Sequence, residues 1–540
     1  MKKLLFASFC LFFAVILGGC ADNEEYIDAS TENTRDTRNA GQMIADGLDL
    51  RGYIPMPERV INSQVEEIHF PHGGVASMIP RKAGIFFYDE RDFGNLFGNL
   101  ELTPFYAPED YYVFDFLFDP NQFEYSFTYT NFYRNIFLSY SREDFAQVSV
   151  MVNGENIAMG DYGGYPEFVI TLLNGEATIV EVTTITHDNQ EYTYTISIYT
   201  PFFEYNQSAA RPVLKGTFIQ PWDNGGPSHF TDDEWDEHLQ MLQRAGINTI
   251  VLQWTARTDA NGNVTSVFFG SAYARENGNP ASAEQTEFMV ERLLRSATKH
   301  NMQVFLGTVI EEDGWWAGAY NNTSWRETQN RIGNIMLQEI YDRYKSMFPD
   351  AFAGWYWAWE MYTVRDYSSF NPAWAEMFSA NTLWLDEIDE YNMPMLISPF
   401  HSSYQGRTPR DAYEQWSNFF EIAHWRDGDI FCAQDSVGAG GGRASLPKAD
   451  ALNRATKTAV RNASTDIAFW INVENFTESE DGRPFTIEPA LIERFIQQLE
   501  VAGRFTDYII TYSYSHFFNG NGSTAERRGD ADYRAYLNMQ

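Results

Sequence analysis

The feature that most constrains the fold is a repeated alternation of short apolar runs with longer amphipathic stretches over residues 212–540. Each apolar run has the length and composition of a strand that is buried on both faces of a parallel sheet. The predicted strands are Lys215–Gln220, Asn248–Trp254, Gln303–Val309, Phe352–Trp359, Met395–Pro399, Ile430–Gln434, Ala468–Val473 and Asp507–Tyr512. Eight such units in about 330 residues predict a (β/α)8 barrel of the TIM type over 212–540. Two separate α/β domains are the alternative.

The stretches between these strands carry helix signals. Thr231 and Glu234 form a capping box at the start of the first stretch. Leu239 and Leu242 then share one face, and Gly246 follows in a position typical of a helix end. The remaining predicted helices are Glu284–His300, Trp325–Phe348, Pro372–Tyr391, Pro409–Trp425, Lys448–Asn462, Pro489–Ala502 and a last one after Ala525.

The region 46–205 has a different period, because apolar and polar residues alternate there. Asn153-Gly154 and Asn174-Gly175 separate the alternating runs, as expected for turns between half-buried antiparallel strands. Two such faces bury each other most simply in a β-sandwich. The stretch Val148–Ile198, with its V-x-V-N-G segment and its closing Y-x-Y-x-I-x-I strand, resembles the cadherin-like modules of bacterial surface proteins. We expect the cadherin-like part to span about 100–200, by that resemblance and by the period-two alternation.

The first residues have the pattern of an export signal. Lys2 and Lys3 precede an apolar run, Leu4–Leu17, that is too short to span a bilayer. The run ends in Gly18-Gly19-Cys20, which resembles a bacterial lipobox and implies that Cys20 becomes lipidated. We therefore expect a signal peptide over 1–19, a polar tether over 20–45, and membrane contact through the lipid anchor only.

An acidic cluster directly after Cys20, Asp22 to Glu25, resembles the export tag of surface-exposed outer-membrane lipoproteins. The expected location is thus the outer membrane, facing outward. Cys432 is the one cysteine that remains outside the leader and anchor, so no internal disulfide is predicted.

Charge and missing motifs exclude several classes of function. The net charge of −36 repels phosphate backbones, which argues against a nucleic-acid partner and suits an uncharged substrate. The sequence contains no H-E-x-x-H metal motif, no G-x-S-x-G at a strand end and no P-loop. We expect neither a cofactor nor a metal ion.

The active site of a (β/α)8 barrel lies at the carboxyl ends of its strands. Glu360 follows the fourth predicted strand and Glu474 follows the seventh, so the two side chains can face each other across the mouth. Cleavage of a glycosidic bond needs two carboxyl groups, one to protonate the leaving oxygen and one to meet the sugar cation or activate water. Neighbouring tryptophans favour Glu360 as the proton donor. The sequence therefore predicts Glu360 and Glu474 as the catalytic pair.

Other residues at the strand ends are candidates for sugar binding. Aromatic rings can stack on the apolar faces of pyranose rings, and amides and carboxylates can bond to the hydroxyl groups. The predicted substrate-binding residues are Gln220, Trp222, Trp254, Glu311, Trp315, Asp435 and Tyr512. Asn472 is a weaker candidate, because strand alternation can turn it away from the mouth.

The segment Gly216–Trp222, together with Trp235 and Ala245–Trp254, resembles the family known as domain of unknown function 4434, which is grouped with TIM-barrel glycoside hydrolases. By strand position, the resemblance implies that Glu360 is the acid/base and Glu474 the nucleophile of a retaining enzyme. The acid of that superfamily commonly follows an Asn, whereas Trp359 precedes Glu360 here, which leaves Glu311, Glu312 and Asp435 open as substitutes. The predicted function is hydrolysis of a poly- or oligosaccharide at the cell surface. The alternative is a glycan-binding lipoprotein with an inactive barrel.

Overall fold

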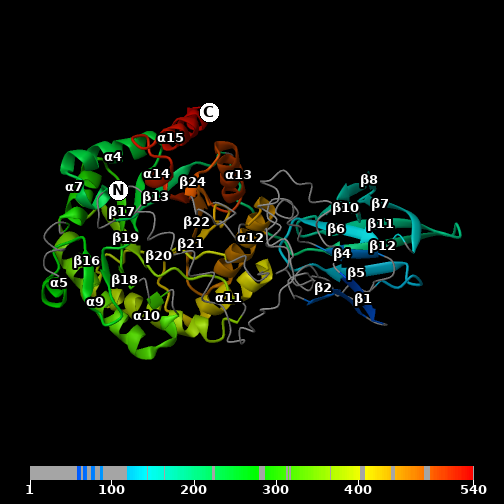
Figure 1. Cartoon of the computed structure of the whole chain (residues 1–540), viewed down its shortest axis with the longest axis horizontal. Coiled ribbons are helices and arrows are strands. Elements are labelled where there is room, and N and C mark those ends of the chain that lie inside the picture. Colours follow the sequence, from blue (N-terminus) through cyan, green and yellow to red (C-terminus); the bar gives the residue numbers. More distant parts are fainter. Residues whose placement is uncertain are drawn as a thin grey trace, which may run out of the picture.

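The computed structural model consists of a β-rich unit and a barrel that lie side by side (Figure 1). It describes residues 58–62, 65–69, 75–78, 85–88 and 118–538, except 141, 143, 163–164, 209, 222–225, 279–285, 287, 312–313, 316–317, 365, 402–407, 440–443 and 479–486. The expected signal peptide, the tether and Cys20 lie outside the described residues, and so do Trp222 and Glu312.

The predicted (β/α)8 barrel is confirmed. Its eight strands form one closed, all-parallel sheet in sequence order. They are β13 (Leu214–Ile219), β14 (Thr249–Leu252), β17 (Gln303–Gly307), β19 (Phe352–Tyr356), β20 (Met395–Ile397), β21 (Ile430–Gln434), β22 (Ala468–Glu474) and β25 (Ile509–Tyr512). Each predicted strand coincides with one of these, so the alternative of two α/β domains is excluded.

Helices surround the barrel (Figure 1). They are α4 (Asp232–Arg244), α5 (Ala272–Asn277), α7 (Met289–Lys299), α9 (Thr323–Tyr344), α10 (Phe370–Ile388), α11 (Pro409–Ile422), α12 (Leu446–Asn462), α13 (Ile492–Gly503), α14 (Tyr514–Phe517) and α15 (Thr524–Asn538), with short 3-10 helices η4 (Gly226–His229) and η5 (Ala319–Asn321). The predicted capping box is present in α4: Thr231 accepts from the Glu234 N–H, and the Glu234 carboxylate accepts from the Thr231 N–H. Gly246 lies beyond the helix end with φ +75°. In the described parts of the chain, no helix is both long and apolar enough to cross a membrane.

Two short sheets are separate from the closed sheet of the barrel. One contains β15 (Ala256–Thr258), β16 (Val264–Val267) and β18 (Val309–Ile310), and the other contains β23 (Phe476–Glu478) and β24 (Ile487–Pro489).

The N-terminal unit is built from β-sheets, as predicted. One sheet has the order β5-β12-β11-β7-β8 and another the order β4-β6-β10-β9. Their strands are β4 (Ile85–Tyr88), β5 (Glu124–Thr128), β6 (Asn135–Tyr140), β7 (Phe145–Val152), β8 (Glu155–Ile157), β9 (Gly160–Tyr162), β10 (Tyr165–Thr171), β11 (Ala177–Thr186) and β12 (Glu191–Tyr199). A third sheet contains β1 (Glu58–Asn62), β2 (Val65–His69) and β3 (Val75–Met78).

The two larger sheets bury one hydrophobic core between them. Val182 and Ile196 of one sheet and Leu138 and Ile170 of the other belong to the same buried cluster. Strand β11 pairs antiparallel with β7 and β12, as predicted, whereas β5, which was not predicted, runs parallel to β12. The likeness of this sandwich to cadherin modules stays a prediction.

One barrel helix, α12, lies against the sandwich (Figure 1). Its Ala451 belongs to the sandwich core, while Leu452 belongs to the barrel core. Arg454 Nη2 donates to Asn174 Oδ1 at 3.0 Å and to the Pro201 carbonyl at 3.4 Å. The two units are therefore joined by buried contacts as well as by the chain.

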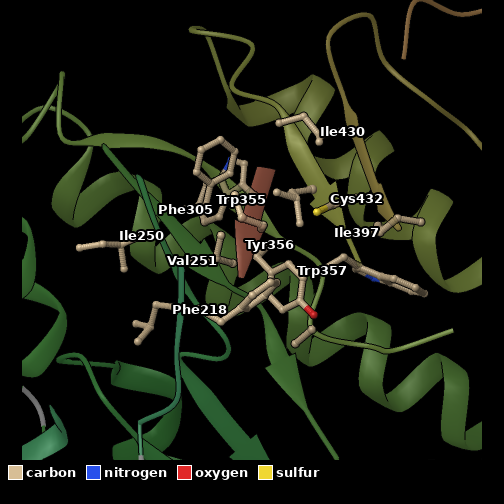
Figure 2. Close-up of a cluster of buried hydrophobic side chains, with 14 of the residues drawn as sticks. Phe218, Ile250, Val251, Phe305, Trp355, Tyr356, Trp357, Ile397, Ile430 and Cys432 are labelled. Atoms are coloured by element: carbon tan, nitrogen blue, oxygen red, sulfur yellow. The ribbon is translucent and has the colours of Figure 1, made fainter. Parts of the chain in front are cut away.

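The ring contacts inside the barrel reveal which residues face its lumen. Phe218 of β13 touches Tyr356 of β19 across the barrel, with ring centroids 5.2 Å apart. Figure 2 shows Tyr356 among the buried side chains of this region, with Trp357 directed away from it. Since side chains alternate along a strand, residues in step with Tyr356, Glu360 among them, face the mouth.

Candidate active site at the mouth of the barrel

Glu474 ends β22 and is buried, with 3% of its surface exposed. Trp470 of the same strand lies across the barrel from Phe305, with ring centroids 5.7 Å apart, so Glu474, four residues on, also faces the lumen. Its Oε2 accepts the backbone N–H groups of Gly438 and Ala439 at 2.6 and 2.8 Å. These donors follow β21, so the loop after one strand holds the carboxyl group of the next. Oε1 accepts no hydrogen bond from the described residues, which leaves it for a ligand.

Asp435 lies behind Glu474 and faces α13, not the mouth. Its Oδ2 accepts from Gln498 Nε2 at 2.6 Å, and its Oδ1 accepts from the backbone N–H groups of Val437 and Glu474 at 3.2 and 3.3 Å. The Gln498 amide also donates to the Glu474 carbonyl at 3.1 Å. Asp435 and Gln498 thus fix the backbone of Glu474 on both sides. This geometry corrects the expectation that Asp435 binds a sugar hydroxyl.

Burial raises the pKa of both carboxyl groups in this pair. Loss of water, followed by repulsion from Asp435, raises the pKa of Glu474 to about 8, against the opposing effect of its two backbone donors. Loss of water raises the pKa of Asp435 to about 6, although the Gln498 amide opposes the shift. Both pKa values are therefore raised from their ordinary range, that of Glu474 more than that of Asp435.

Glu360 lies beyond the end of β19, three strands from β22 around the barrel, and is only half-buried. Its Oε1 accepts from Gln434 Nε2 at 2.6 Å, and the same amide donates to the Ser398 carbonyl at 2.7 Å. Gln434 and Asp435 are consecutive, so alternation at the end of β21 sends the first toward Glu360 and the second behind Glu474. The end of one strand thereby contacts both predicted catalytic residues.

Among the described residues, the partly exposed aromatic rings at the mouth are those of tyrosine and phenylalanine, and not those of Trp254 and Trp315. Tyr512 is half-buried beside Phe218, and its role in sugar binding stays a prediction. Tyr362 and Phe400 stack with centroids 5.3 Å apart, and both are half-buried just beyond β19 and β20. Sequence reasoning missed this pair. The signal was available, because Tyr362 lies two residues after Glu360 in the segment that follows β19.

Trp254 and Trp315 are buried, which corrects their predicted roles as sugar platforms. Trp254 lies on the outer side of β14, where Arg257 approaches its ring. Trp315 packs edge-on against Trp359, with centroids 6.5 Å apart, in the layer between the barrel and its helices.

Glu311 is also occupied by structural contacts. Its Oε1 accepts from the Gly314 N–H at 3.0 Å and its Oε2 from Trp325 Nε1 at 2.9 Å. Because both carboxylate oxygens of Glu311 already accept hydrogen bonds within the protein, Glu311 is poorly placed as a substitute for Glu360 or as a substrate ligand.

Amide side chains complete the mouth. Gln220 follows β13 in step with the lumen-facing Phe218, and Gln253 follows β14 with its Oε1 buried and without a hydrogen-bond partner among the described residues. Asn472 is buried lower in the lumen, where its Nδ2 donates weakly to Ser398 Oγ at 3.4 Å. Gln253 was not predicted, yet its unpaired oxygen suits a donor from a ligand. Among the described residues, no group of three or more His, Cys, Asp or Glu is arranged to hold a metal ion.

A family profile matches residues 214–524, which is more than half of the chain, under the description Domain of unknown function (DUF4434). The chain belongs to this family. The DUF4434 match begins at the first residue of β13 and ends at the first residue of α15, so it contains every barrel strand. No curated protein matches the chain.

Solved structures similar to this DUF4434 chain include three from Bacteroides species. A “putative alpha-L-fucosidase” from Bacteroides thetaiotaomicron has 20% identity and a TM-score of 0.48, over 63% of this chain and 96% of that chain. The GH5 xyloglucanase of Bacteroides ovatus has 9% identity and a TM-score of 0.34, over 78% and 98%. A family 39 glycoside hydrolase from Bacteroides cellulosilyticus has 9% identity and a TM-score of 0.34, over 75% and 76%.

Proposed function

We propose that the barrel hydrolyses glycosidic bonds of a poly- or oligosaccharide, with Glu360 and Glu474 as its two carboxyl groups. The observation that carries this proposal is the position of these two residues at the ends of β19 and β22, facing one lumen in different electrostatic surroundings. Glycoside hydrolysis needs one protonated and one ionised carboxyl group on either side of the bond.

The surroundings suggest roles that differ from the sequence expectation. Glu474 holds its proton at neutral pH because burial raises its pKa to about 8, and this suits the group that protonates the leaving oxygen. Glu360 receives an amide donor at the more open side of the mouth, where a carboxylate can approach the sugar carbon or a water molecule. Glu474 is thus the proposed acid and Glu360 the proposed nucleophile or base.

Aryl glycosides with a good leaving group test these roles, since such a group departs without being protonated. We expect Glu474→Gln to cleave activated aryl glycosides but not the natural glycan, and Glu360→Gln to cleave neither. The reverse result would restore Glu360 as the acid. Full activity of both variants on a cleaved glycan would refute the pair. The anomeric form of the first product, read by NMR, distinguishes the retention that the family resemblance implies from inversion.

The location at the cell surface is part of the proposal. Its support is the leader that ends in Gly18-Gly19-Cys20 and the acidic residues after it. We expect labelled palmitate to be incorporated into the chain and lost in Cys20→Ala, and external protease to cleave the protein on intact cells. Labelling without surface cleavage would place the protein on the inner side of the membrane.

A non-catalytic glycan-binding barrel is the second candidate. The burial of Glu474 beneath the Gly438 and Ala439 N–H groups favours it, because a substrate must still reach that carboxyl group. Binding of a glycan without product, under conditions in which a control hydrolase cleaves it, would support this candidate.

A further inference from the structure

A second cavity lies between the sandwich and the barrel, outside the mouth. We call it the interdomain cleft, and it has a volume of about 330 Å³. This volume is within the range of small-ligand sites, which are mostly apolar with a few polar groups. The cleft is lined by Tyr129, Thr130, Phe132, Tyr133, Thr200, Pro201, Phe202 and Phe203 of the N-terminal unit and by Arg410, Tyr413, Glu414, Arg454 and Thr458 of the barrel.

Aromatic rings from both units form the walls of the cleft. Phe202 lines the cleft and is 72% exposed, so its ring is accessible to a ligand. Phe132 and Tyr413 are half-buried, and their ring centroids are 5.6 Å apart across the interface. Phe132 has φ +70°, a left-handed conformation that bulky residues rarely adopt. A sandwich residue is thus held in an uncommon conformation where its ring meets the barrel.

Charged groups stand at the rim of the same cleft. Arg410 Nε donates to Glu414 Oε1 at 2.9 Å, and Arg410 Nη1 donates to Thr130 Oγ1 at 3.3 Å. The side chains of Arg410 and Glu414 are 56% and 44% exposed, so both can still reach a ligand. A guanidinium and a carboxylate side by side can donate to and accept from neighbouring hydroxyl groups.

We propose that the interdomain cleft is a second sugar-binding site that holds one or two pyranose units of an uncharged glycan. Flat rings beside a donor–acceptor pair match a pyranose, which has an apolar face and neighbouring hydroxyls around its edge. The net charge of −36 disfavours acidic glycans. The choice of a glycan rests on the proposed function, but the cleft is separate from Glu360 and Glu474. The cleft would hold one part of a polysaccharide on the protein while another part of the same polysaccharide lies in the barrel mouth.

Affinity electrophoresis of the full chain through gels that contain uncharged polysaccharides tests this site. We expect retardation by at least one polysaccharide of the panel, and a loss of about three- to tenfold in affinity for Phe202→Ala and for Tyr413→Ala. Phe288→Ala is the matched control, because Phe288 is 50% exposed near the start of α7 and is not part of the cleft. Each variant is also run in a native gel without polysaccharide, where migration equal to that of the wild type excludes unfolding.

Two results would overturn the proposal: no retardation of the wild-type chain by any polysaccharide, or equal retardation of Phe202→Ala, Phe288→Ala and the wild type. Hydrolysis is measured separately on short oligosaccharides that fill the mouth alone, where Phe202→Ala should equal the wild type. If binding depends on the cleft but neither the wild type nor any variant hydrolyses a glycan, the proposed function is refuted and the second site is supported. If the protein hydrolyses a glycan but binding does not depend on the cleft, the second site is refuted and the proposed function is supported.

Discussion

The two sides of the barrel mouth place the same residue type in opposite surroundings. On the β19 side, Glu360 is half-buried and accepts from the side-chain amide of Gln434. On the β22 side, Glu474 is buried, its carboxyl group is held by two backbone donors, and its backbone is fixed by Asp435 and Gln498. The comparison shows that the fold supplies two carboxyl positions at one mouth, which differ in their burial and in the donors that reach them.

The first way to test the comparison is to remove each acid. We expect Glu360→Gln and Glu474→Gln each to lower kcat on a natural glycan by about 10²–10⁴-fold, because each role is indispensable. Glu311→Gln is the matched control, since its carboxylate is already bonded to Gly314 and Trp325. A large loss for Glu311→Gln with normal Glu360→Gln activity would move the site to β17.

The pH dependence of stability tests the buried carboxyl groups of Glu474 and Asp435 and needs no substrate. The folded-state pKa of Glu474 is raised to about 8 and that of Asp435 to about 6, so the folded protein binds more protons than the unfolded chain above pH 4 to 5. Their contribution is complete below the unfolded pKa values and is lost as the pH rises to about 8.

We therefore expect the free energy of unfolding to fall as the pH rises from 5 to 8, by up to about 1.4 kcal/mol per pH unit for each proton released. Glu474→Gln should flatten this slope, and Glu360→Gln should not, when both are followed by urea unfolding. Equal slopes in all three proteins would contradict the assignment of the proton to Glu474.

Two substitutions of Asp435 distinguish the effect of its charge on the pKa of Glu474 from its role as a hydrogen-bond acceptor that stabilises the fold. Asp435→Leu removes the acceptor of the buried Val437 and Glu474 N–H groups and one of the two acceptors of the Gln498 amide, and should cost about 2–3 kcal/mol of stability. Asp435→Asn keeps the shape and removes the charge that repels the Glu474 carboxylate, so the pKa of Glu474 should fall. The alkaline limb of the pH–rate profile should then move to lower pH. An unchanged limb would show that burial alone sets this pKa.

The smallest effect on activity is expected from a substitution beside Glu360, the less buried of the two carboxyl groups. Gln434→Leu removes the donor to Glu360 Oε1, and should reduce kcat by about two- to tenfold with little change in stability. Steady-state kinetics and urea unfolding of the same sample distinguish a role at the mouth from a structural one. A loss as large as that of Glu360→Gln would mean that Gln434 itself acts on the substrate.

The barrel could be predicted from the sequence because the eight apolar runs and the amphipathic stretches between them indicate the order of strands and helices. The direction of each side chain could not be predicted, because strands buried on both faces lack a clear alternation of polar and apolar residues. Gln253 and Trp254 are consecutive, as are Gln434 and Asp435. In each pair the residue predicted to bind sugar is the one whose side chain faces away from the lumen. One cross-barrel contact, Phe218 with Tyr356, resolves the choice for β13 and β19, but such a contact is not encoded locally.

The sandwich illustrates a second limit. Its turns and alternation are local signals, and they predicted strands correctly. The parallel pairing of β5 with β12 joins segments about 70 residues apart, and it depends on which edges meet in space.

Helix α12 contributes to two cores at once, through Ala451 on one face and Leu452 on another. A barrel expressed from residue 212 onward would present Ala451 and the guanidinium of Arg454 to water, without Asn174 and Pro201 to receive it. Such a fragment should self-associate, and the intact chain should melt in a single transition. In evolution, the N-terminal unit could not be exchanged for an unrelated module without new residues on this helix, so the two units have to change together.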